Sequence, residues 1–376
     1  MRRQRIGLIV NPVAGMGGRV GLKGTDGLDI LAEARRRGAV PEAGTRTRRA
    51  LARLAPARDR ILLLAAAGAM GEEAARAEGF DPEIVGSPAP ETFAEHTRSA
   101  ARAMLGLRAD LVLFAGGDGT ARDLHSVLAD AVPMLGIPTG VKMHSAVFAA
   151  SPEAAGWLLA RFAGAEETAI AFRASEIMDI DEQAVRSNRT AARLYGYARV
   201  PYERHLVQNA KAAGYREDEA AVAAAGREMA AAMEAGVTYV VGPGSSAKQV
   251  LVGLGISGTL LGVDVVRNRA LLGRDLSEGD ILALCKDCPV RIVVGVIGGQ
   301  GFLFGRGNHP IGPELIRQAG RDGIIVIAGR NKLASLPDRR LLVDTGDPEL
   351  DRELAGYLRV VTGPGETMVV KVSAGE

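Results

Sequence analysis

The first 164 residues alternate between short apolar runs and amphipathic stretches, and this alternation constrains the fold more than any other feature. Helical patterns, among them residues 91–106, separate runs that are continuously apolar, as expected of strands buried on both faces. Such alternation predicts a doubly wound parallel sheet, in which ligands bind at the carboxyl ends of the strands. The five predicted strands are residues 5–10, 61–68, 82–87, 110–117 and 132–138.

Two glycine-rich loops fall at predicted strand ends, in a chain with 48 glycines among 376 residues. Glycine lets backbone N–H groups converge on an anion. The first loop, residues 11–27, matches neither the dinucleotide fingerprint nor the P-loop. Two alternatives stay open for it: a phosphate cradle in which Lys23 adds a charge, or a surface loop without a ligand. Its candidate phosphate-binding residues are Asn11, Gly15, Gly17, Gly18, Lys23 and Thr25.

The second loop, Gly116-Gly117-Asp118-Gly119-Thr120, places a carboxylate among glycines at the end of a buried strand. A carboxylate near an attacking hydroxyl can accept its proton or hold a metal ion. Thr120 is expected to N-cap the following helix, whose positive end would face the same anion. The alternative is that Asp118 only caps this helix and serves the scaffold, in which case it has no role in chemistry.

Asn11-Pro12 and Gly15 after the first strand, together with residues 116–120, resemble the superfamily of NAD kinases, diacylglycerol and sphingosine kinases and 6-phosphofructokinases. Nearly the whole chain resembles the ATP-NAD kinase family, in a divergent branch that includes the acetoin-catabolism X-type proteins. The segments that carry this likeness are residues 17–27, 116–120, 136–149 and 298–308.

The resemblance implies phosphoryl transfer from ATP or polyphosphate to the 2′-hydroxyl of the adenosine ribose of NAD, with Mg²⁺ or another divalent cation. It assigns Asp118 to the acceptor hydroxyl or the metal ion, and Gly116, Gly117, Gly119 and Thr120 to the donor phosphates. Two other functions stay open: a kinase of another small alcohol, and a nucleotide-binding accessory protein of a catabolic pathway with little catalysis.

Residues 136–149 occupy the position of a loop that lines the NAD site in NAD kinases. By this likeness Thr139, Gly140, Lys142 and Ser145 are expected to contact the nucleotide, whereas His144 is expected to be a cap or surface residue. The Asn-acid pair that helps to hold NAD in commoner NAD kinases is missing. Its stand-ins would be Asp179, Asp181 and Glu182, for which a charged hairpin turn is the simpler interpretation.

The second half mixes strand-like and helical segments, and residues 174–186 and 191–202 read as paired strands. We expect an α/β nucleotide-binding domain over residues 1–160 and a mixed α/β substrate domain over 161–376, with the active site in the cleft between them. Gly244, Ser245 and Ser246 follow a strand and open a helix, with a serine as its cap, which predicts a second phosphate cradle. Arg306 and Asn308 are further candidates, since a guanidinium suits phosphate.

Composition argues against several classes of partner. The formal net charge of +2 is too small to indicate a nucleic acid or a membrane, and aromatic residues are only 4% of the chain. No apolar run reaches the roughly 18 residues of a membrane span, and no signal peptide opens the chain, so we expect a cytoplasmic protein. Cys285 and Cys288 form a C-x-x-C pair that we interpret as a turn, rather than a redox or zinc site. The resemblance alone implies a homodimer.

Overall fold

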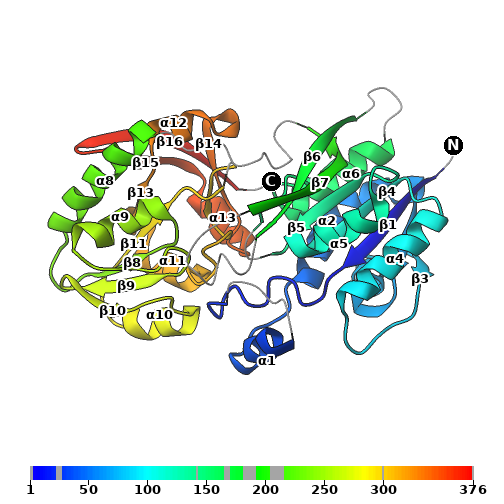
Figure 1. The fold of residues 1–376 in the computed structure, drawn as a ribbon, viewed down its shortest axis with the longest axis horizontal. Helices are drawn as coiled ribbons and strands as arrows, with labels where there is room; N and C mark the ends of the chain where they lie inside the picture. Colours follow the sequence, from blue (N-terminus) through cyan, green and yellow to red (C-terminus); the bar gives the residue numbers. More distant parts are fainter. Residues whose placement is uncertain are drawn as a thin grey trace. The chain divides into compact units, whose positions relative to one another are not determined.

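The structure is a computed structural model that describes residues 3–22, 28–140, 143–164, 170–180, 192–203, 216–298 and 300–374. The chain divides into two compact units, one of residues 1–16 and 40–210 and the other of residues 17–39 and 211–375. Figure 1 shows the helices and strands of each unit. Within the described ranges, no helix is long and apolar enough to cross a membrane.

A five-stranded sheet forms the centre of the first unit, and its strand order is β3-β2-β1-β4-β5. Every neighbouring pair is parallel, which confirms the predicted doubly wound sheet. The chain runs outward from β1 to β3 and then returns to β4 on the other side of β1, so the winding reverses between β1 and β4. The strands are β1 (Gln4–Val10), β2 (Ile61–Ala66), β3 (Glu83–Val85), β4 (Leu111–Gly116) and β5 (Met134–Pro138).

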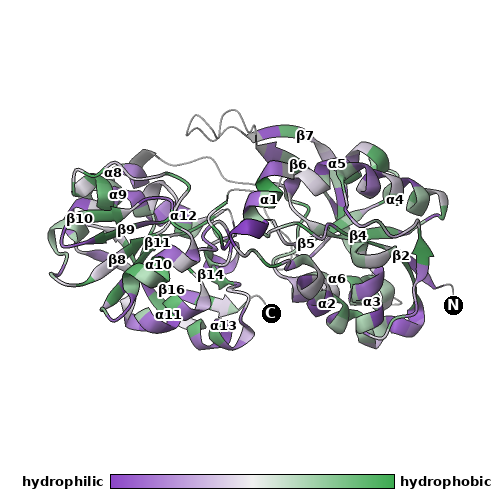
Figure 2. Ribbon diagram, turned by 90° about the horizontal axis from the view of Figure 1, so that it is seen from below, coloured by the Kyte–Doolittle hydropathy of each residue, from purple (hydrophilic) through white to green (hydrophobic). Residues whose placement is uncertain are grey.

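Helices cover both faces of this sheet, because each central strand is apolar on both sides. Figure 2 shows α4 and α5 on one side and α2 and α6 on the other, and the helices of each pair pack together. The helices are α2 (Ala43–Leu54), α3 (Glu72–Ala77), α4 (Ala94–Gly106), α5 (Asp118–Leu128) and α6 (Pro152–Gly164), with 3₁₀ turns at Ala55–Arg60 and Gly68–Met70.

A separate antiparallel hairpin of β6 (Ala171–Ile180) and β7 (Ala192–Tyr202) completes the first unit and confirms the predicted paired strands. Its register shifts between Ile177 and Met178. Ile177, Ala198 and Val200 are buried, and the hairpin packs on α5 and β5. The hairpin therefore lies beside the helix that begins at Asp118.

The second unit is built on a nine-stranded mixed sheet of order β10-β9-β8-β11-β13-β15-β16-β14-β12, which confirms the expected mixed α/β architecture. Strands β8, β11, β13 and β15 run parallel to one another. Strands β16, β14 and β12 run the opposite way, because β15 and β16 pair antiparallel. The strands are β8 (Thr238–Val241), β9 (Asp264–Arg267), β10 (Ala270–Gly273), β11 (Val290–Gly295), β12 (Phe302–Phe304), β13 (Ile324–Ile327), β14 (Arg340–Val343), β15 (Gly356–Gly363) and β16 (Glu366–Ala374).

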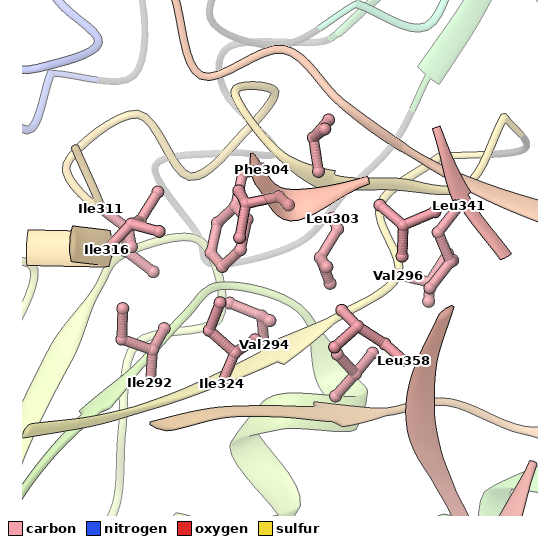
Figure 3. Packing of buried hydrophobic residues seen from close by; sticks show 14 of the residues in the cluster. Ile292, Val294, Val296, Leu303, Phe304, Ile311, Ile316, Ile324, Leu341 and Leu358 are labelled. Carbon is pink, nitrogen blue, oxygen red and sulfur yellow. The ribbon is translucent and has the colours of Figure 1, made fainter. Parts of the chain in front are cut away.

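Two apolar clusters hold this unit together, one on each face of the sheet. One includes residues of α8 and α9 against β8, β11 and β13. The larger one lies on the other face, where side chains of β11 and β13 point toward Leu303 and Phe304 of β12 (Figure 3). The helices are α1 (Leu28–Arg36), α8 (Arg216–Ala231), α9 (Ser245–Gly253), α10 (Glu278–Cys285), α11 (Pro313–Ala319), α12 (Arg330–Ala334) and α13 (Pro348–Leu354), with 3₁₀ turns at Arg321–Gly323 and Pro337–Arg339.

Candidate functional site

Three loops of the first unit meet where the winding of its sheet reverses. They follow β1, β4 and β5, which are neighbours and parallel, so their carboxyl ends lie along one edge. In open α/β sheets this switch point is where ligands bind. The structure brings together here most of the sequence-predicted residues of the first unit, namely Asn11, Gly15, Gly116, Gly117, Asp118, Gly119, Thr120, Thr139, Gly140 and Ser145.

Glycine is required in these loops because they touch backbone to backbone. Gly15 has a φ of +80°, and a Cβ there would lie 2.1 Å from the carbonyl oxygen of Thr139. The carbonyl oxygen of Gly116 accepts hydrogen bonds from the N–H groups of Thr139 and Gly140, both at 3.1 Å. The glycines therefore join the three loops into one piece, whatever ligand the loops bind.

Asn11 and Thr120 connect the first loop to the second. The side-chain amide of Asn11 donates to the Thr120 hydroxyl (3.1 Å), and its backbone N–H donates to the carbonyl oxygen of Ala115 (2.9 Å). The predicted capping role of Thr120 is wrong: the N-cap residue is Gly117, and Thr120 lies inside the first turn of α5. The hydroxyl pairs with a neighbouring loop, which no local sequence pattern indicates.

The amino terminus of α5 is composed of residues 118–120, whose N–H groups precede the first helical hydrogen bond, from Ala121 N–H to Gly117 carbonyl. Such N–H groups and the helix dipole favour a negatively charged partner. The predicted positive helix end at this loop is therefore present, although Gly117 rather than a side chain occupies the cap.

Asp118 is buried, with 5% of its surface exposed, and its carboxylate does not cap α5. Its oxygens accept backbone N–H groups of the segment after β5: His144 at 2.6 Å and Ser145 at 3.0 Å. The alternative in which Asp118 caps α5 is therefore wrong. Asp118 does, however, make hydrogen bonds within the protein, to the segment after β5. An ionised carboxylate has about four lone-pair sites, so two bonds leave acceptor capacity on it.

Burial raises the pKa of Asp118 from 3.8 to about 7. Hydrogen bonds from the Ser145 side chain and from the backbone N–H groups of His144 and Ser145 oppose this shift, and the negative charge of Asp179 adds to it. Desolvation has the largest effect on this pKa, because the buried carboxylate has lost most of its water. A carboxylate with a pKa near 7 has the proton affinity suited to general-base chemistry.

Ser145 and Arg122 connect this site to the β6–β7 hairpin. The hydroxyl of Ser145 donates to the Met178 carbonyl (2.8 Å), and Arg122 pairs with Asp179 (2.5 Å). Sequence reasoning did not single out Arg122. Its spacing of four residues from Asp118 could have indicated it, because residues i and i+4 share a helix face.

In the second unit, Gly17 and Gly18 belong to a turn that closes on itself, with Leu22 N–H donating to the Gly17 carbonyl (2.8 Å). Arg19 of this turn pairs with Glu278 at the start of α10 (3.4 Å). The structure thus assigns the two halves of the predicted first loop to different units.

The second predicted cradle, Gly244 to Ser246, follows β8 and opens α9, as expected. The N-cap residue is Gly244, without a side-chain cap hydrogen bond, so the predicted serine cap is wrong. Behind this turn Lys248 and Asp264 form a buried ion pair (2.8 Å), which the sequence analysis did not predict.

Arg306 and Asn308 follow β12, in a turn whose Gly307 lies against Ile297, just beyond the carboxyl end of β11. Both ends of the Asn308 amide bind its own turn: Oδ1 accepts Gly305 N–H and Nδ2 donates to the Leu303 carbonyl. Arg306 is buried, with its guanidinium 4.1 Å from the centre of the Phe302 ring. A role for these two residues in binding phosphate stays a prediction.

Cys285 and Cys288 lie within the described residues, whereas several other predicted residues do not. Both thiols are free, and burial, with a smaller contribution from Cys288, raises the pKa of the Cys285 thiol to about 11. Cys285 ends a helix rather than opening one. In the ranges that the structure describes, no group of three His, Cys, Asp or Glu residues is arranged to hold a metal ion. The residues outside the described ranges are Lys23, Thr25, Lys142, Asp181 and Glu182.

Comparison with protein families matches both units of the chain. Residues 6–166 match the ATP-NAD kinase N-terminal domain, and residues 234–372 match the ATP-NAD kinase C-terminal domain. Comparisons with curated proteins and with solved structures found no match. The two domain matches cover most of the chain in the order that the family requires, and the chain belongs to the ATP-NAD kinase family.

Proposed function

We propose that the protein transfers a phosphoryl group from ATP or polyphosphate to the 2′-hydroxyl of the adenosine ribose of NAD, forming NADP. Membership of the ATP-NAD kinase family supports a phosphotransferase that acts on nucleotides. In the proposed step the ribose oxygen bonds to the terminal phosphorus of the donor, and the bond from that phosphorus to its bridging oxygen breaks. The leaving group is ADP or a polyphosphate shortened by one unit.

Asp118 is proposed to accept the proton of the 2′-hydroxyl. The observation that carries this proposal is a buried carboxylate at the switch point, held by two backbone N–H groups and with its pKa raised to about 7. The two bonds orient the carboxylate and leave lone pairs for an alcohol proton. The N–H groups of residues 118–120 at the start of α5 would bind a phosphate oxygen beside it.

A divalent cation would share this site in the proposed reaction. Mg²⁺ usually keeps several waters and binds through one or two carboxylates together with substrate phosphates. Asp118 fits that pattern, since its carboxylate keeps acceptor capacity beside the hydrogen bonds from His144 and Ser145. The cation would neutralise charge on the transferring phosphoryl group.

The proposal is tested by incubating the purified full chain with NAD or NADH, each with ATP or polyphosphate and Mg²⁺, and measuring NADP or NADPH with a dehydrogenase specific for these products. The expected result is product formation with NAD or NADH and at least one donor. Calorimetric titration with NAD and ATP accompanies the assay. Tight binding of both nucleotides without any conversion would contradict the proposal and favour a nucleotide-binding accessory protein.

A further inference from the structure

Ser145 lies between Asp118 and the β6–β7 hairpin and makes hydrogen bonds in both directions. It is fully buried. Its backbone N–H donates to Asp118 Oδ1 (3.0 Å), and its side chain also interacts with that carboxylate and lowers the pKa of Asp118. Its hydroxyl donates to the carbonyl oxygen of Met178 (2.8 Å) and accepts the Met178 N–H (3.0 Å). One residue therefore links the carboxylate to a strand more than thirty positions further along the chain.

The link falls at the irregular point of the hairpin. The pairing of β6 with β7 shifts register between Ile177 and Met178, and both backbone groups of Met178 bind Ser145. Next to it, Ala146 N–H donates to the carbonyl oxygen of Glu176 (2.8 Å). Residues 145–146 thus pair with the edge of β6, and the Ser145 hydroxyl supplies two of the hydrogen bonds in that pairing.

We propose that Ser145 is a positioning residue for Asp118. By fixing residues 144–146 against β6, the hydroxyl aims the N–H groups of His144 and Ser145 at the two carboxylate oxygens. The catalytic consequence of this inference rests on the proposed function. Ser145 itself needs no contact with the nucleotide in this role, in contrast to the nucleotide contact predicted from the sequence.

The physical basis is that phosphoryl transfer depends on geometry, and a displacement of about 1 Å at a reacting group can cost about 10²-fold in rate. Without the hydroxyl, the N–H and carbonyl groups of Met178 lose a buried partner, and each such loss destabilises the local arrangement. The segment of residues 144–146 then loses two hydrogen bonds to the hairpin, whereas α5 keeps its packing against β6.

The test compares Ser145→Ala and Ser145→Thr with a matched control, Ser151→Ala. Ser151 is equally buried six positions further on, and its hydroxyl accepts the Ala154 N–H at the start of α6 (3.0 Å). Ser145→Ala is expected to lower kcat for NADP formation about 10–100-fold while KM for NAD changes little, because the substrate contacts are kept. Ser145→Thr, which keeps a hydroxyl, should recover most of the lost kcat, and Ser151→Ala should retain the wild-type value.

Combination with Asp118→Asn separates positioning from general weakening of the fold. If Ser145 acts through Asp118, Ser145→Ala lowers kcat no further in the Asp118→Asn background, because coupled residues are not additive. An additive loss in the double variant, or a rise in KM with kcat unchanged, would overturn the inference.

Hydrogen exchange of the full chain gives a readout that does not need activity. Ser145→Ala is expected to speed exchange of the amides of residues 144–146 and of β6, whereas Ser151→Ala affects the start of α6. If the wild-type chain forms no NADP, the proposed function fails, and the exchange result still decides whether Ser145 holds the segment at Asp118. Unchanged exchange at residues 144–146 in Ser145→Ala overturns the inference in either case.

Discussion

Replacing Asp118 with Asn should change how the stability of the first unit depends on pH. Burial raises the pKa of Asp118 in the folded chain to about 7, while an unfolded chain has the ordinary value of 3.8. Between these values the folded state binds the proton and the unfolded state does not. The contribution of the protonated Asp118 to the free energy of unfolding is therefore fully present below about pH 4 and is lost as pH rises through about 7.

The size of the effect follows from the shift. A pKa rise from 3.8 to about 7 corresponds to roughly 4 kcal/mol, at 1.36 kcal/mol for each pKa unit. Asp118 is almost fully buried, so solvent screening reduces this value little. The free energy of unfolding of Asp118→Asn should therefore rise relative to wild type by up to about 4 kcal/mol between about pH 4 and pH 8, because Asn does not titrate.

Urea unfolding at a series of pH values, followed by tryptophan fluorescence, measures this difference. The chain has one tryptophan, Trp157 on α6, so the signal reports the unit that contains Asp118. Asp123→Asn is a matched control on the same helix, where the carboxylate pairs with Arg98 (2.8 Å). A constant difference between Asp118→Asn and wild type over this pH range would refute the reasoning, as would a difference that falls with pH.

Two further predictions concern packing in each unit. Gly15→Ala should destabilise the first unit by about 3 kcal/mol or more, since φ is +80° and the new Cβ would meet the Thr139 carbonyl oxygen. Gly44→Ala in α2 is the control, because its new Cβ meets nothing within 4 Å. It should be neutral or stabilising when unfolding is followed by the same Trp157 fluorescence. Lys248→Met should destabilise the second unit by about 3–5 kcal/mol, because it leaves the buried carboxylate of Asp264 without its cation. Calorimetric melting measures that loss, and Arg291→Gln, which removes an exposed ion pair with Glu234, should leave the melting temperature nearly unchanged.

Much of the fold could be predicted because apolar runs and glycine loops are local signals. All five predicted strands of the first sheet are present, and the end of each is within about two residues of its predicted position, as boundaries of this kind usually are. The caps of α5 and α9 were predicted wrongly, because glycine takes the position in both. In these loops close packing of the backbone outweighs the preference for a hydroxyl at the N-cap.

The site was predictable in its central residue and not in its surroundings. Asp118 follows a strand in a recognisable motif, so its place at the switch point followed from the sequence. Its partners did not: Ser145 is 27 positions away, and Asp179 is 61 positions away in a hairpin whose register shift no local pattern indicates. Hydrogen bonds between distant segments depend on tertiary packing, which composition and periodicity do not encode.

Transfer of labelled phosphate measures whether the Asp118 carboxylate takes part in phosphorylation of NAD. Wild type and Asp118→Asn are mixed with NAD, Mg²⁺ and ATP labelled at its terminal phosphate, and the rate at which label enters the 2′ position is measured, with polyphosphate as an alternative donor. We expect 2′-labelled NADP from the wild type and a rate about 10²–10⁴ times lower from Asp118→Asn. A variant that labels NAD as fast as the wild type would contradict this expectation.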